Sequence, residues 1–322
     1  MPLNTPAASD VHVNKPLTDI LIGYHNSEYI ADEIFPTVIV NKQTDIIPAI
    51  SQSAFFRNES AVPLGEAEVA SDVGYEVDTT ATYYCNRYGQ RHFISDDRRV
   101  NEDDPFDSDR EATMLVTDKL MMNREVAFVT DFWTTGIWGT DVTGGTTVVK
   151  WSSYGTSSPI EDVRTYRRTI RRLIGRNPNT LVLGDLTYDR LMDHPDILER
   201  IIYTERGIAS TDLLASLFQV DRVLVGNSVT TTSAEGTAEA SVTYTANWDD
   251  DALLLYVPSR PSIWEPSAGY TFVWNVGMGN GLQWMRKYRN EEILGDFIEV
   301  RSYYDQMKTS KPAGIFFSDI VD

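Results

Sequence analysis

Apolar and polar side chains alternate near the carboxyl end of the chain, from Phe297 to Tyr304. This alternation is typical of a β-strand with one buried face. After a short polar break, residues 313–317 are almost entirely apolar and predict a second, more fully buried strand. We therefore expect a C-terminal strand pair, preceded by a Gly-rich turn at 277–281.

The longest helix is predicted at about 107–133. Carboxylates crowd its start, where they favour the positive end of a helix dipole, and Pro105 suits a first-turn position. Apolar positions then recur at steps of seven, four, three and four, so this stripe should face a core. The stripe consists of Leu115, Met122, Val126, Val129 and Trp133. At ~1.5 Å per residue the helix would be about 40 Å long, and it is expected to be the spine of its domain.

A second helix is predicted to begin near Ser158, with two different sides. Its apolar side consists of Val163, Tyr166, Ile170, Leu173 and Ile174. Its other side carries Arg164, Arg167, Arg168, Arg171 and Arg172. This arginine stripe is the one concentrated positive charge of the sequence, and two interpretations stay open. It either pairs with carboxylates of a neighbouring segment or subunit, or meets nucleic-acid phosphates without sequence preference.

Residues 178–281 read as a compact α/β unit. The predicted strands are 179–184, 222–225 and 252–257, and the predicted helices are 186–193, 196–203 and 213–218. Asp185 is expected to cap the first helix, and Thr211 or Asp212 the last. Residues 230–247 are small and polar and predict a loop or hairpin tip.

The amino-terminal part has few segments that could pack alone. Residues 1–16 are polar and proline-bearing, which suits an extended arm. Short helical pieces are expected between 17 and 34, and 38–40 and 45–47 predict two strands that pair around a polar turn. Residues 51–80 cannot supply a core, and the aromatic segment that follows, 83–93, predicts a strand returning from this long excursion.

Composition narrows the class of protein. With 322 residues and 42% apolar content, the chain can bury one large core or two modest ones. It has no apolar run near the roughly 20 residues that span a bilayer, and its start lacks the apolar core of a signal peptide, so export is not expected. Cys85 is the only cysteine, which fits a reducing cytoplasm. The formal charge of −19 opposes tight binding of nucleic acid over most of the surface.

No catalytic or cofactor motif stands out. The four histidines do not have metal-ligand spacing, and the single thiol has no histidine at a recognisable spacing. The segment 277–281 lacks the lysine and hydroxyl of a phosphate-binding loop, so a turn is the better interpretation. His194 precedes Pro195 and fits a helix start better than a catalytic base. We expect neither enzymatic activity, nor a metal site, nor a cofactor.

The order of these elements resembles the major capsid proteins of tailed bacteriophages with the Hong Kong phage fold. The resemblance covers almost the whole chain: arm, extended loop, spine helix with an acidic start, the run from NPNTLVLGD through LTYDRLMDHPDILERI to FQVDRVLVGNS, and the C-terminal strands. It implies an α+β phage major capsid fold. The implied segments are an N-terminal arm (1–48), an extended β loop (49–95), a peripheral domain with the spine helix (96–177), an axial α/β domain (178–281), and C-terminal strands that return to the peripheral domain (282–322).

The resemblance also implies a function and partners. The chain would self-assemble as hexamers and pentamers into the icosahedral shell of a phage head, in the host cytoplasm, and enclose double-stranded DNA. The segment before the first predicted strand pair, 1–37, is too short for a fused scaffolding domain, so a separate scaffolding protein is expected. A portal protein is implied too. Between Lys42 and Lys119 there is no lysine for an intersubunit isopeptide bond, so buried area, salt bridges or a cement (decoration) protein must stabilise the shell.

Two surfaces are candidate sites. Two adjacent phenylalanines on a projecting loop would be a liability if exposed, so we expect Phe55, Phe56 and Arg57, near the loop tip, to contact another subunit. The arginine stripe is the candidate for an interior surface that faces scaffold or packaged DNA. The alternative function is an encapsulin, a compartment shell of the same fold that binds cargo enzymes. A carbohydrate-binding or adhesin-like β protein fits the Tyr and Trp content but not the spine helix.

Overall fold

The computed structural model describes residues 29–50, 52–58, 63–64, 69–70, 72–75, 77–101, 107–201, 210–234, 236–261, 265–275 and 284–322. Within these ranges no helix combines the length and the apolar character needed to cross a membrane. The arm at 1–16, the helical pieces expected at 17–28 and the Gly-rich turn at 277–281 lie outside the described residues.

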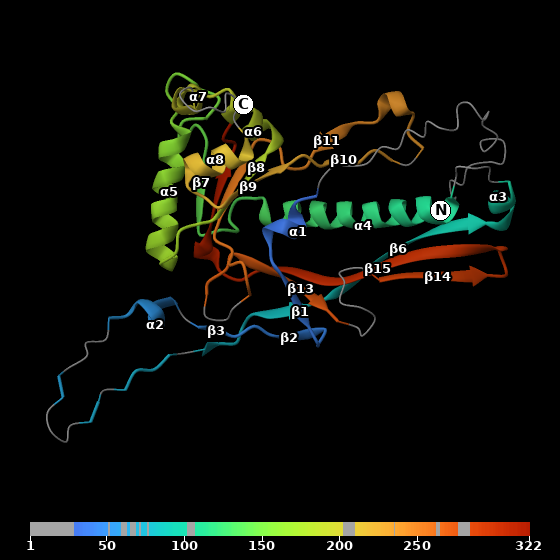
Figure 1. Ribbon diagram of the computed structural model, residues 1–322, viewed down its shortest axis with the longest axis horizontal. Coiled ribbons are helices and arrows are strands. Elements are labelled where there is room, and N and C mark those ends of the chain that lie inside the picture. Colours follow the sequence, from blue (N-terminus) through green and yellow to red (C-terminus); the bar gives the residue numbers. More distant parts are fainter. Residues whose placement is uncertain are drawn as a thin grey trace.

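One five-stranded sheet forms an elongated layer along a long helix (Figure 1). Its strands are β1 (Thr37–Val40), β6 (Asn86–Ser95), β13 (Gly269–Trp274), β14 (Trp284–Asn290) and β15 (Gly295–Lys308). β15 is antiparallel to β6, β13 and β14, while β1 is parallel to β13. The helix is α4 (Ser108–Phe132), and the short α3 (Asp96–Val100) follows β6. The predicted spine helix and the strand at 297–304 are therefore confirmed. The single buried face predicted for that strand was wrong, because both faces of β15 are buried from Gly295 to Val300.

A second five-stranded sheet has the order β7, β16, β12, β8, β9. These strands are β7 (Thr140–Thr143), β8 (Thr180–Gly184), β9 (Arg222–Gly226), β12 (Ala252–Leu255) and β16 (Gly314–Ser318). The helices of this unit are α5 (Pro159–Ile174), α6 (Asp185–Met192), α7 (Pro195–Ile201) and α8 (Thr211–Phe218). β8 and β12 are buried along their whole length, as their apolar sequences predict. The hairpin β10 (Val229–Thr231) and β11 (Tyr244–Ala246) confirms the prediction for 230–247.

The two C-terminal strands do not form the pair that the sequence predicts. β15 belongs to the first sheet, whereas β16 lies between β7 and β12 in the second. Periodicity identifies a strand, but its partners depend on contacts far apart in the sequence. The end of the chain therefore links the two sheets instead of closing one of them.

The buried face of α4 differs from the predicted stripe. Deeply buried positions follow a step of four: Ser108, Ala112, Val116, Leu120, Arg124, Phe128 and Phe132, with Glu125 beside them. The predicted stripe was wrong, because Leu115 is 47% exposed and Trp133 alone of its five members is buried. Serine, arginine and glutamate lie on the buried side, so apolar positions alone place the face incorrectly.

The extended loop projects from the first sheet (Figure 1). Its elements are β2 (Thr44–Ile46), β3 (Ala49–Ile50), α2 (Gln52–Phe56), β4 (Val77–Asp78) and β5 (Thr82–Tyr84). The predicted pairing of 38–40 with 45–47 was wrong: β1 pairs with β13, and β2 pairs with the returning β5. The loop is therefore a narrow two-stranded ribbon, with β3 pairing β4 further out.

The helix caps also differ from the predicted residues. Asp185 is the first residue of α6, and Gly184 holds the N-cap position. In α8 the cap is Ser210, whose hydroxyl accepts a hydrogen bond from the N–H of Leu213 at 3.4 Å. Several neighbouring residues at each helix start suit the N-cap position, so the residue preference alone does not identify which of them is the cap.

Candidate assembly surfaces

Glu125 joins three parts of the fold. Its fully buried carboxylate accepts a hydrogen bond from the backbone N–H of Ala31 at 2.8 Å and from the indole N–H of Trp248 at 2.8 Å. The N–H of Ile30 donates to it at 3.3 Å. Burial raises the pKa of Glu125, and these hydrogen bonds oppose that rise. The short α1 (Ala31–Ile34) is thereby attached to α4 and to the segment before β12.

An ion pair fixes the same segment on the spine helix. The guanidinium of Arg124 donates to Asp32 at 2.7 Å and lies 4.9 Å from the centre of the Tyr304 ring. The hydroxyl of Tyr29 donates to Asp118 at 2.7 Å. Burial lowers the pKa of Arg124 and raises that of Asp32, and the attraction between the two charges opposes both shifts. Residues 29–34 therefore enter the body at a defined place on α4.

One part of the extended loop lies against the body. The side-chain amide of Gln52 donates to the carbonyl of Leu173, and a Cβ on Gly175 would be 3.0 Å from the Phe56 ring. Figure 1 shows α2 between the body and the loop tip, which corrects its expected position near the tip. Phe56 is 56% exposed and Arg57 is exposed, while the side chain of Phe55 is not among those described. Contact of these residues with another subunit stays a prediction.

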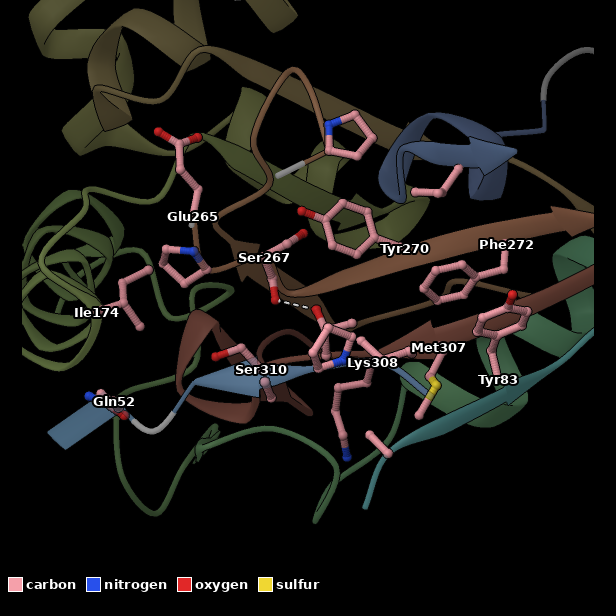
Figure 2. Close-up of a pocket in the computed structure, with 18 of the residues that line it drawn as sticks. Gln52, Tyr83, Ile174, Glu265, Ser267, Tyr270, Phe272, Met307, Lys308 and Ser310 are labelled. Carbon is pink, nitrogen blue, oxygen red and sulfur yellow. Dashed lines mark hydrogen bonds between the residues drawn. The ribbon is translucent and has the colours of Figure 1, made fainter. Parts of the chain in front are cut away.

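A cavity of about 740 Å³ lies where the loop joins the body. Figure 2 shows Tyr83 on the loop side of this cavity and Tyr270 and Met307 on the side of the first sheet. Near α5, Arg176 forms a salt bridge of 3.2 Å with Glu265, and both residues line the cavity. The walls of the cavity therefore belong to the loop and to the body.

The arginine stripe is largely exposed. Its members Arg164, Arg168, Arg171 and Arg172 lie on the outer side of α5. Arg167 is half-buried and donates to the side chain of Gln219 at 2.6 Å, and burial lowers its pKa. In the described part of the chain, no carboxylate lies within 4 Å of any of the five. The structure therefore brings four of the predicted residues together and places the fifth against α8.

His194 and Cys85, which the sequence does not favour as catalytic residues, are both buried. His194 is buried, and its Nε2 lies 2.9 Å from the hydroxyl of Ser157. Among the described side chains, no group of three or more His, Cys, Asp or Glu could hold a metal ion. Cys85 is buried against the first sheet, and burial raises its pKa to about 11.

Comparisons with known proteins agree with this architecture. No family model matches the chain. Its fold is shared with a phage-related protein from Bordetella bronchiseptica RB50, at a TM-score of 0.70 and 21% identity over 92% of this chain and 94% of that one. A protein of the capsid of cyanophage P-SCSP1u has a TM-score of 0.59 and 12% identity, over 98% and 96% of the two chains.

One curated relative matches the chain in sequence. The chain is 27% identical over 271 residues to a major capsid protein of Burkholderia phage BcepMu, which covers 80% of this chain and 82% of the relative. The chain is thus similar in sequence to a phage major capsid protein, and in fold to phage capsid proteins. The expected phage major capsid fold is therefore confirmed.

Sequence reasoning missed the buried junction of this protein. Glu125 and Trp248 are 123 residues apart in the chain, so no local pattern connects them. A charged pair, Arg124 and Glu125, within an otherwise amphipathic helix was the available signal. Adjacent charged residues are usually exposed, so the sequence offered no reason to expect that Arg124 and Glu125 are buried and hold the amino-terminal segment.

Proposed function

We propose that this protein assembles as hexamers and pentamers into the icosahedral head of a tailed phage and encloses double-stranded DNA. The observation that carries the proposal is the 27% identity to a phage major capsid protein over most of both chains. The fold alone supports a shell subunit, but it does not distinguish a shell that encloses DNA from one that encloses cargo enzymes. The proposed role is structural rather than catalytic.

The two sheets suggest how a subunit would be arranged in the shell. We assign the first sheet and α4 to the peripheral domain, and the second sheet with its helices to the axial domain, near the predicted bounds of 96–177 and 178–281. β16 pairs with strands of the second sheet, so the assignment of 282–322 to the peripheral domain is kept for β14 and β15 only. The ribbon at 49–95 and the segment before Tyr29 would reach neighbouring subunits.

The proposed partners follow from the family. A separate scaffolding protein would guide assembly, and a portal protein would occupy one vertex. Buried area, salt bridges or a cement protein would stabilise the shell, because the extended loop has no lysine for an isopeptide bond. Packaged DNA would meet the inner surface without sequence preference. The arginine stripe suits either an inner surface that faces scaffold or DNA, or a contact between subunits.

Electron microscopy of particles tests the shell function. The chain would be expressed together with a candidate scaffolding protein encoded beside it, and closed particles of uniform size are expected. Nucleic acid absorbance of particles purified from infected cells supports a phage head. A co-purifying enzyme in place of nucleic acid would favour an encapsulin, and absence of closed or ring-shaped assemblies under all conditions would contradict the proposal.

A further inference from the structure

Two rows of opposite charge lie on different helices of the second unit. Arg164, Arg168 and Arg172 are spaced by four residues along α5, and all three are exposed. Asp185, Asp189 and Asp193 are also spaced by four, along α6 and its C-cap. A step of four residues advances ~6 Å along a helix, so the two rows have the same spacing. We call them the arginine row and the aspartate row.

Neither row has an ion-pair partner in the part of the subunit that the structure describes. In the described residues, no ion pair within 4 Å involves a member of either row. One carboxylate oxygen of Asp185 is buried and accepts no hydrogen bond there, although a buried acceptor without a partner is costly. By contrast, Arg99, Arg286 and Arg289 each pair with a carboxylate.

The rows lie on two flanks of the unit. Figure 1 shows α5 along one side of the unit and α6 toward the other, beside β8 and β9, with α8 between the two helices in this view. Subunits in a closed ring contact each other head to tail, so each subunit uses two different faces. A basic face on one flank and an acidic face on the other meet this requirement.

Resting on the proposed shell function, we propose that the arginine row of one subunit binds the aspartate row of the next subunit in a ring. Each chain carries a net charge of −19, so copies repel one another unless local complementarity offsets the repulsion. Arginine suits this role because its planar guanidinium forms paired hydrogen bonds with a carboxylate. Three rungs face three rungs, and Arg168 meets Asp189 in the middle whether the helices run parallel or antiparallel.

Charge reversal at the middle rung tests the proposal. Arg168→Glu and Asp189→Arg should each raise the concentration needed for assembly by about tenfold or more, since like charges then face each other in the interface. The double variant R168E/D189R should assemble close to the wild-type concentration. A mixture of the two single variants should form six-membered rings at a lower concentration than either variant alone, because the variants can alternate there and every interface then pairs opposite charges. Circular dichroism should show native folding throughout, because both side chains are exposed.

Two control variants and a second measurement separate the outcomes. Arg110→Glu and Asp131→Arg make the same charge changes at exposed positions of α4, outside the rows and the extended loop, and should assemble normally. Failure of the double variant to recover would overturn the proposal. Normal assembly of the single variants would also overturn the proposal. If R168E assembled normally but lost packaged DNA, and D189R kept its DNA, the arginine row would face DNA instead. Sedimentation of free chains measures ring-sized association even if shells never close, so failure of the shell function and failure of this contact remain distinguishable.

Discussion

Glu125 on the spine helix and Trp248 before β12 share a hydrogen bond of 2.8 Å, although neither side chain reaches solvent. The same carboxylate accepts the N–H of Ala31. One side chain thus replaces the water that would otherwise satisfy donors from two distant segments. The position of the amino-terminal segment is therefore coupled to the packing between the spine helix and the second sheet.

Removal of this carboxylate should be costly. Glu125→Ala would leave the N–H groups of Ile30 and Ala31 buried without an acceptor, and the indole N–H of Trp248 would keep only the hydroxyl of Ser228 at 3.2 Å. We expect a loss of about 3 kcal/mol in the free energy of unfolding. Urea denaturation followed by tryptophan fluorescence measures it. Glu199→Ala, at an exposed position of α7, is the matched control and should change stability little. Equal stability of the two variants would contradict the role assigned to Glu125.

Asp251 should make stability depend on pH. Its carboxylate accepts the N–H of Asp319 at 2.7 Å, and burial raises its pKa from 3.8 to about 7. The folded state therefore keeps this proton at pH values where the unfolded state has lost it. The contribution of this group to the free energy of unfolding should fall as pH rises from about 4 to about 7.

Substitution of Asp251 by asparagine tests this sign. Asp251→Asn keeps an oxygen acceptor and removes the charge, so it should abolish that part of the decline and raise stability at pH 8. Asp249→Asn, two residues away and exposed, should leave the decline in place. Denaturation midpoints of the three proteins between pH 4 and 8 provide the comparison, and parallel curves for D251N and the wild type would show that Asp251 is ionised throughout.

Close packing on Trp248 should also make Gly226 intolerant of a side chain. A Cβ at Gly226 would lie 2.1 Å from the Trp248 ring, which is buried beside Phe128. Gly226→Ala should therefore destabilise the subunit by about 1–3 kcal/mol or more through overpacking. At Gly155 a Cβ would meet nothing within 4 Å, so Gly155→Ala should be nearly neutral. The midpoints of thermal unfolding of both variants test this contrast. A wild-type midpoint for Gly226→Ala would contradict the predicted overpacking against Trp248.

The extended loop should affect assembly more than folding. Phe56 is 56% exposed, so replacement of Phe55 and Phe56 by serine should leave the circular dichroism spectrum unchanged and reduce the yield of closed particles several-fold. Val100→Ser changes an exposed apolar side chain outside the loop and serves as the control. Normal particle yield from the loop variant would contradict the predicted contact of Phe55 and Phe56 with another subunit.

In this protein the sequence predicts where the helices and strands lie better than it predicts which segments they pack against. Periodicity located the spine helix and the strands β8, β9 and β12 within a few residues, because these patterns are local. It misassigned the partners of β1 and β15, because strand pairing depends on distant segments. It also misplaced the buried face of α4, since Arg124 and Glu125 are buried where apolar residues were expected. Of the candidate sites, the sequence showed the arginine stripe as a charge pattern. The aspartate row was not recognised, because its relation to the arginine row depends on α5 and α6 lying in the same unit of the fold.

The place of β16 has a consequence for synthesis. β7 pairs with β16 alone in its sheet, and β16 lies between β7 and β12. The second sheet therefore stays incomplete while residues up to Ser318 are still on the ribosome or within its exit tunnel. A nascent chain cannot present a finished unit to its neighbours before translation reaches that point. Contacts between subunits that need the finished second sheet can therefore form only after β16 has emerged and paired with β7 and β12.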